Sequence, residues 1–88
     1  MTKEELAQKI AQGEYTDCQR DSKFSISFKI GDVKASITKA GNIIMAMTVI
    51  STDISEEYYN KILKEALNNE MAELRRKADE IRRDISEL

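Results

Sequence analysis

The chain lacks histidine, tryptophan and proline, and it contains one cysteine and three glycines. Without histidine, the chain cannot build a Ser-His-Asp or Cys-His catalytic centre or a histidine-containing zinc site. A lone cysteine supplies neither an intramolecular disulfide nor a thiolate metal cluster. The glycines are too scattered for a phosphate-binding loop. We therefore expect a non-catalytic protein that needs no cofactor and no metal.

Long apolar runs are also missing. The longest, Ile43 to Met47, is far below the roughly 20 residues that a membrane-spanning helix needs. The single cysteine, together with a polar start that does not resemble a signal sequence, leads us to expect a cytoplasmic protein. The 14 basic and 16 acidic residues give a net charge of −2, which argues against a highly basic nucleic-acid binder but leaves room for a local patch.

The N-terminal residues predict a short helix. Thr2 and Glu5 have the spacing of a capping box, in which each side chain satisfies a free backbone N–H of the first turn. The helix is expected from about Lys3 to Gln12, ending at a glycine that suits the left-handed C-terminal position. The next segment, residues 14–22, is polar and has no period, which predicts a loop.

Three strands are expected next, as an antiparallel meander. Residues 23–30 alternate between apolar and polar side chains, and Gly31-Asp32 fits a two-residue hairpin turn. The second strand ends near Thr38. A three-residue loop, Lys39 to Gly41, would set Ile43, Met45, Met47 and Val49 inward, and Ile44, Ala46 and Ile50 outward. The third strand would then be an apolar edge. The predicted core consists of Phe24, Ile26, Phe28, Ile37, Met45 and Met47 with Leu6, Ile10, Ile62 and Leu63.

The last segment, Ser55 to Leu88, is expected to form one helix of roughly 50 Å. Apolar residues in its second half are spaced alternately by four and three, as in a coiled-coil seam. These seam residues are Leu67, Met71, Leu74, Ala78, Ile81, Ile85 and Leu88. The sequence therefore predicts an α+β domain over residues 1–66 and a projecting helix over residues 67–88 that self-associates, most simply as a homodimer.

The sequence leaves the direction of helix pairing open. In a parallel pair, Glu70 would meet Arg75 of the second chain favourably, but Lys77 would face Arg82. In one antiparallel alignment, Lys77 would meet Asp84, but Arg75 would face Arg82. Arg75 and Arg82 are also candidates for binding an acidic partner.

A second candidate for partner binding is the outer face of the first two expected strands. This face carries Lys23, Lys29 and Lys34 among serine and threonine residues, with no acidic side chain. This positive surface, which we call the lysine plate, could contact phosphates or an acidic protein surface. The alternative is that its lysines serve only to keep the face soluble.

The order helix, three strands, helix is similar to that of double-stranded-RNA-binding domains, although Glu56 and Glu57 stand where those domains have a basic cluster. In size and in lack of motifs, the chain resembles small phage-encoded inhibitors such as anti-CRISPR proteins. We expect an inhibitor- or adaptor-like protein that binds a protein or nucleoprotein partner. The alternative is a nucleic-acid-binding protein that uses the lysine plate.

Overall fold

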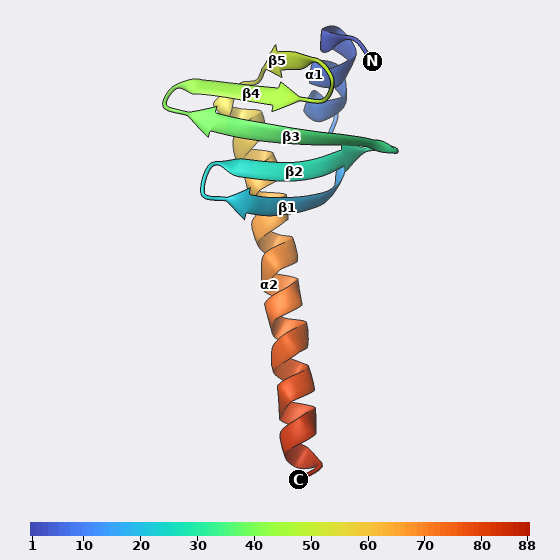
Figure 1. The fold of residues 1–88 in the computed structure, drawn as a ribbon, viewed down its shortest axis with the longest axis vertical. Helices are drawn as coiled ribbons and strands as arrows, with labels where there is room; N and C mark the ends of the chain where they lie inside the picture. The colour runs from blue at the N-terminus through green and yellow to red at the C-terminus, as the bar shows by residue number, and fades with distance from the viewer.

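The structure, a computed structural model describing residues 1–88, consists of one antiparallel sheet with two helices behind it (Figure 1). Its elements are α1 (Lys3–Ala11), β1 (Thr16–Ser22), β2 (Ser25–Ile30), β3 (Val33–Ala40), β4 (Ile43–Met47), β5 (Ser51–Asp53) and α2 (Glu56–Ser86). The strands pair in chain order, so the sheet is a five-stranded meander. The α+β class and both helices are confirmed, whereas the expected count of three strands is wrong.

The segment expected to be a loop, residues 14–22, contains β1. Its pairing with β2 shifts register twice, and Asp17 has a φ of 56°, the left-handed conformation typical of a bulge. Cys18 is the only buried residue of β1. The two shifts break the alternation of faces, which explains why the sequence shows no strand period here.

The hairpin of β2 and β3 is confirmed. Ile30 pairs with Val33 and Lys29 with Lys34, as the two-residue turn requires. Gly31 has a φ of 61°, which glycine adopts without the steric cost of a Cβ atom.

The register predicted for β4 is wrong by three residues, because Ile37 pairs with Ala46 and not with Ile43. Ala40 pairs with Ile43, so the loop has two residues instead of three. Because side chains alternate along a strand, this shift exchanges the two faces. Ile44 is 7% exposed and Ala46 is fully buried, whereas Ile43 is 63% exposed and Met47 is also exposed.

The strand β4 is also not an edge, because β5 pairs with it on the far side. The central strand is therefore β3, and the sheet ends at β1 and at β5. The helix α1 contacts β5, so β1 is the long uncovered edge. Phe24 lies in the turn between β1 and β2, where it is 52% exposed and lies under the Lys23 ammonium.

The core lies between the inner sheet face and the two helices. Of the predicted core, the structure buries Leu6, Ile10, Ile26, Phe28, Ile37 and Ile62. Leu63 is partly buried against the same cluster. Phe24 and Met47 are exposed, and Met45 lies on the outer face at intermediate exposure, so these three predictions are wrong.

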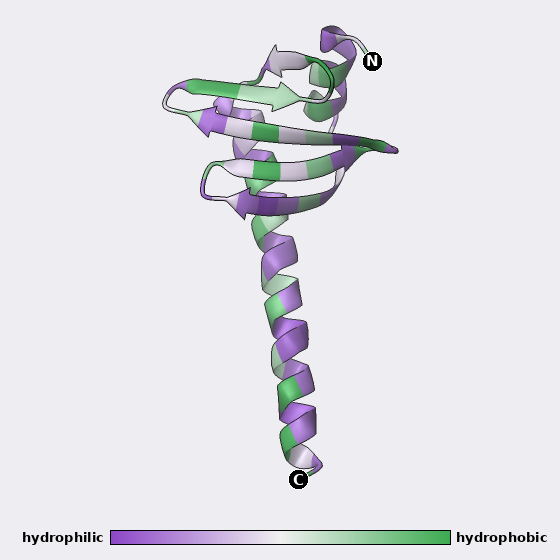
Figure 2. Ribbon diagram, in the orientation of Figure 1, coloured by the Kyte–Doolittle hydropathy of each residue, from purple (hydrophilic) through white to green (hydrophobic).

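The helix α2 crosses the sheet and continues past β1 (Figure 1). Its first half buries Tyr59, Ile62 and Ala66, and every residue from Leu67 onward is exposed. Figure 2 shows apolar positions recurring along this otherwise hydrophilic projecting half. Neither α2 nor α1 has the length and apolar character that crossing a bilayer would require.

The register of β4 predicts opposite effects for two neighbouring isoleucines. Ile44→Ala removes buried methyl groups and should lower the free energy of unfolding by about 2–5 kcal/mol. Ile43→Ala, the same change on the outer face, should cost no more than about 1 kcal/mol. Urea denaturation of both variants at one protein concentration measures the difference. Equal losses would mean that the faces of β4 are assigned wrongly.

Candidate interaction surfaces

The projecting half of α2, residues 67–88, is the most distinctive surface, and we call it the arm. All seven seam residues are exposed, and among the large ones within the helix the exposed fraction runs from 36% for Leu67 to 62% for Ile85. Leu67 lies closest to the sheet and is the least exposed of the large seam residues. A contiguous apolar stripe without cover marks a surface that associates with another molecule.

The seam points sideways from the sheet. Successive helix residues are turned by roughly 100°, which places the seam about 100° around α2 from the sheet-facing residues Tyr59, Ile62 and Ala66. The sheet-facing side of the arm continues instead through polar residues such as Asn69, Glu73 and Glu80. The seam is therefore not an extension of the protein's own core.

Ion pairs on the arm leave particular charges free. Arg76 pairs with Glu73 and, at 3.0 Å, with Glu80. Arg82 lies 3.6 Å from Asp79. By contrast, Arg75, Lys77 and Asp84 make no ion pair within the chain. These three free charges are available to a partner.

Glu70, at the start of the arm, already forms an ion pair with a residue of its own domain. Its carboxylate accepts a hydrogen bond of 2.8 Å from the Arg20 guanidinium on β1. Asn69, beside it, donates from Nδ2 to the Cys18 carbonyl oxygen at 3.1 Å. Both contacts tie the exposed edge strand to α2 at the point where the helix leaves the sheet.

The lysine plate is less positive than the sequence predicts. Strand β1 brings two carboxylates to this region: Asp17 lies 3.9 Å from the Lys29 ammonium, and Asp21 accepts a hydrogen bond from Ser27. The expectation of a face without acidic residues is wrong, because Asp17 and Asp21 lie on β1, a strand that the sequence pattern does not reveal. Lys29 and Lys34 do lie opposite each other, and Lys23 lies apart in a turn.

An apolar strip on the outer face was missed because of the register error in β4. Ile43, Met45 and Met47 point outward along this strand, and Met45 and Met47 pair with Thr38 and Ser36 of β3. Neither of these two β3 residues carries a charge. A correct two-residue loop at Gly41-Asn42 would have identified the strip from the sequence.

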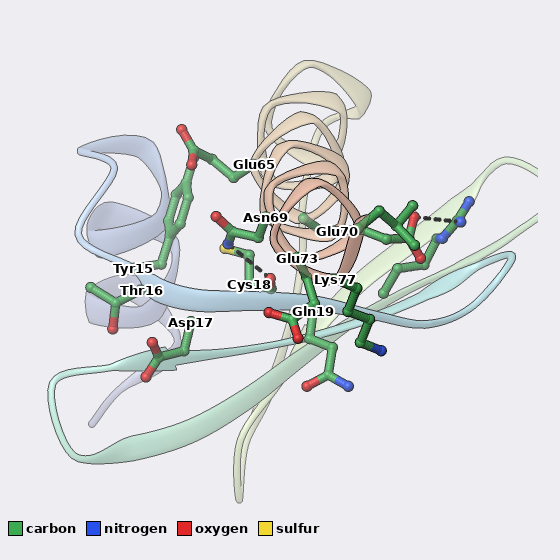
Figure 3. Close-up of a pocket in the computed structure, with 13 residues that line it drawn as sticks. Tyr15, Thr16, Asp17, Cys18, Gln19, Glu65, Asn69, Glu70, Glu73 and Lys77 are labelled. Atoms are coloured by element: carbon green, nitrogen blue, oxygen red, sulfur yellow. Dashed lines mark hydrogen bonds and ion pairs between the residues drawn. The ribbon is translucent and has the colours of Figure 1, made fainter. Parts of the chain in front are cut away.

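A groove of about 940 Å³ separates β1 from α2 (Figure 3). Most of the residues that line it are polar or charged, and Tyr15, Asp17 and Cys18 lie on one side with Glu65, Asn69 and Glu73 on the other. No group of three or more histidine, cysteine, aspartate or glutamate side chains gathers with metal-binding geometry.

Cys18 is poorly suited to be a nucleophile. Burial raises the pKa of its thiol to about 11, and the Glu65 and Asp17 carboxylates add to the shift. Only the thiolate is strongly nucleophilic, so at neutral pH almost none of the reactive form is present. The pKa of Tyr15 is also raised, first by burial and then by Cys18 and Glu65.

Comparisons of the chain with protein-family models, with curated proteins and with solved structures found no match. The function of the protein must therefore be inferred from its own surfaces.

The state of Cys18 can be tested by alkylation with iodoacetamide. A thiol pKa of about 11 instead of 9.0 lowers the thiolate fraction at pH 8 by roughly 100-fold, and burial slows the reaction further. We expect native protein to react at least that much more slowly than protein in denaturant, with the native rate still rising from pH 8 to pH 10. A native rate equal to the denatured rate would contradict the buried, high-pKa thiol.

Proposed function

We propose that this protein is a non-catalytic binding protein that works as a homodimer joined through the arm of α2, in the manner of an inhibitor or adaptor. The observation that carries the proposal is the uncovered seam, which repeats at coiled-coil spacing along the whole projecting half of the helix. Two such helices bury their seams against each other, because each apolar side chain inserts between residues of the facing helix.

The small size of the core adds to this argument. Thirteen residues are buried, and every one of them belongs to a single cluster in the globular half. A domain of this size is marginally stable alone. Association that occurs only in the folded state adds to stability by mass action. Dimerisation would therefore support folding as well as function.

The outer sheet face is the surface proposed for the macromolecular partner. It presents an apolar strip on β4 beside uncharged serine and threonine residues, with the Lys34 ammonium free of any ion pair. An apolar centre with a positive margin fits a protein surface that is apolar in the middle and acidic at its rim. Nucleic-acid binding is less favoured, because Asp17 and Asp21 reduce the positive potential of the plate.

If the protein is a dimer, introducing charged residues into the seam should lower its molar mass in solution. Leu74→Glu with Ile81→Glu places unpaired carboxylates in the seam, where burial is costly. Multi-angle light scattering should give about twice the chain mass of 10.1 kDa for the wild type and the chain mass for this variant. The matched control is Ala72→Glu with Ser86→Glu, which adds the same charge on exposed arm positions outside the seam and should remain dimeric. A wild-type monomer at high micromolar concentration would refute the proposal.

The proposed partner surface can be tested by capturing the partner from a lysate of the source cells that has been treated with nuclease. We expect capture to require the apolar strip. Ile43→Ser with Met47→Ser should abolish capture while the circular dichroism spectrum and the dimer mass stay unchanged. Val33→Ser, a similar change at an exposed residue outside the strip, is the control. Reversing Lys23, Lys29 and Lys34 to Glu should weaken capture most at low salt. Capture that nuclease abolishes would favour nucleic-acid binding instead.

A further inference from the structure

We propose that the two arms pair antiparallel, with Met71 of one chain opposite Leu88 of the second, so that the two sheets lie at opposite ends of a rod. This inference rests on the proposed dimer and specifies its geometry. Three observations support it: the length of the free arm, the sizes of the facing side chains, and the charges that each chain leaves unpaired.

The length of the free arm fits this alignment. The edge strand β1 meets α2 near Asn69 and Glu70, through the contacts of these residues with Cys18 and Arg20. Residues 71–88 lie beyond that point and extend about 27 Å. Pairing Met71 with Leu88 overlaps these segments completely and brings the tip of each arm up to the other domain without overlapping it. Leu67 lies outside the overlap. Its own domain covers Leu67 more fully than any other large seam residue.

The facing side chains are better matched in size in this alignment. Each layer joins two different residues: Met71 with Leu88, Leu74 with Ile85, and Ala78 with Ile81, each occurring twice in the dimer. The small Ala78 side chain therefore always meets a large one. In a parallel dimer Ala78 would face its own copy and leave a poorly filled layer at the centre of the arm, which costs packing energy.

The free charges also favour the antiparallel pair. Lys77 and Asp84 make no ion pair within the chain, and this alignment places Lys77 of each chain beside Asp84 of the second. Its unfavourable contact, Arg75 against Arg82, is reduced because Asp79 lies 3.6 Å from Arg82.

A parallel dimer has a weaker charge pattern. Its favourable contact would join Glu70 to Arg75 of the second chain, but the Glu70 carboxylate is already held by Arg20 at 2.8 Å. Its contact between Lys77 and Arg82 remains repulsive. Oppositely directed helices also bring opposite ends of their macrodipoles together.

The consequence for function is a bivalent molecule. Two outer sheet faces separated by the length of the rod can engage two sites on one large partner or two partner molecules at once. A parallel dimer would instead hold both domains at the same end.

Disulfide trapping distinguishes the orientations. In a Cys18→Ala background, chains carrying Leu74→Cys are mixed with tagged chains carrying Ile85→Cys and oxidised with glutathione disulfide. The antiparallel dimer should yield mainly the mixed disulfide, because residues 74 and 85 face each other, while each variant alone stays uncrosslinked. Efficient self-crosslinking of Leu74→Cys alone would show parallel pairing and overturn this inference while leaving the dimer intact. A monomeric mass for the uncrosslinked wild-type protein would refute both proposals.

A charge variant gives an independent measurement that does not depend on cysteine geometry. Lys77→Glu should weaken an antiparallel dimer about three- to tenfold, because the new carboxylate faces Asp84 of the second chain at both ends. Adding Asp84→Lys should restore the dissociation constant. In a parallel dimer the same Lys77→Glu change should tighten association, because the introduced carboxylate would face Arg82 of the second chain. Sedimentation equilibrium measures the direction of the change, and tightening would overturn the antiparallel assignment.

Discussion

The organisation of this protein depends on a mismatch of length between one helix and one sheet. The strands cross α2 at a steep angle (Figure 1), so the width of the sheet, and not the length of a strand, limits how much of the helix is covered. Five strands at about 4.8 Å spacing span roughly 20 Å, whereas the 31 residues of α2 extend about 46 Å. Adding two strands to the expected three therefore widens the domain but still leaves the second half of α2 bare.

The edge strand shows how closely the domain and the helix depend on each other. Strand β1 contributes only Cys18 to the core, so few apolar contacts hold it on the sheet. The backbone pairing with β2 holds the strand on the sheet, and polar contacts from α2 add to it: Asn69 satisfies the Cys18 carbonyl, and Glu70 binds Arg20. These contacts join residues about 50 positions apart in sequence, and they form only when α2 is docked. The helix thus stabilises the strand at which it leaves the domain.

Part of this arrangement could be predicted from the sequence, because its signals are local. The capping box at Thr2, the Gly31-Asp32 turn and the heptad spacing of the arm each depend on neighbours within a few residues, and the structure has Thr2 accepting from the Glu5 N–H as expected. The angle between the seam and the sheet-facing side of α2 also follows from the spacing of the apolar residues along the helix. All of these features are periodic or involve residue types with strong conformational preferences.

Two features, strand β1 and the assignment of the two faces of β4, depend on tertiary contacts that no local sequence pattern reveals. Strand β1 has two register shifts and a left-handed Asp17, which destroy the alternation that would identify it. In β4 every residue is apolar, so both faces look alike, and one residue of loop length decides which becomes the core. The apolar strip and the two carboxylates of the lysine plate were missed for these two reasons.

The two ends of the sheet also limit where another chain can bind. At one end α1 lies against the short β5. At the other, the β1 edge carries a bulge and the charged Asp17, Arg20 and Asp21, and Asn69 already occupies a carbonyl that an added strand would need. These are the features by which natural sheets discourage edge-to-edge pairing. With both edges protected, the seam of the arm and the outer sheet face remain as the surfaces for association. They point in different directions, so in the proposed dimer one surface joins the two chains while the other stays free for the partner.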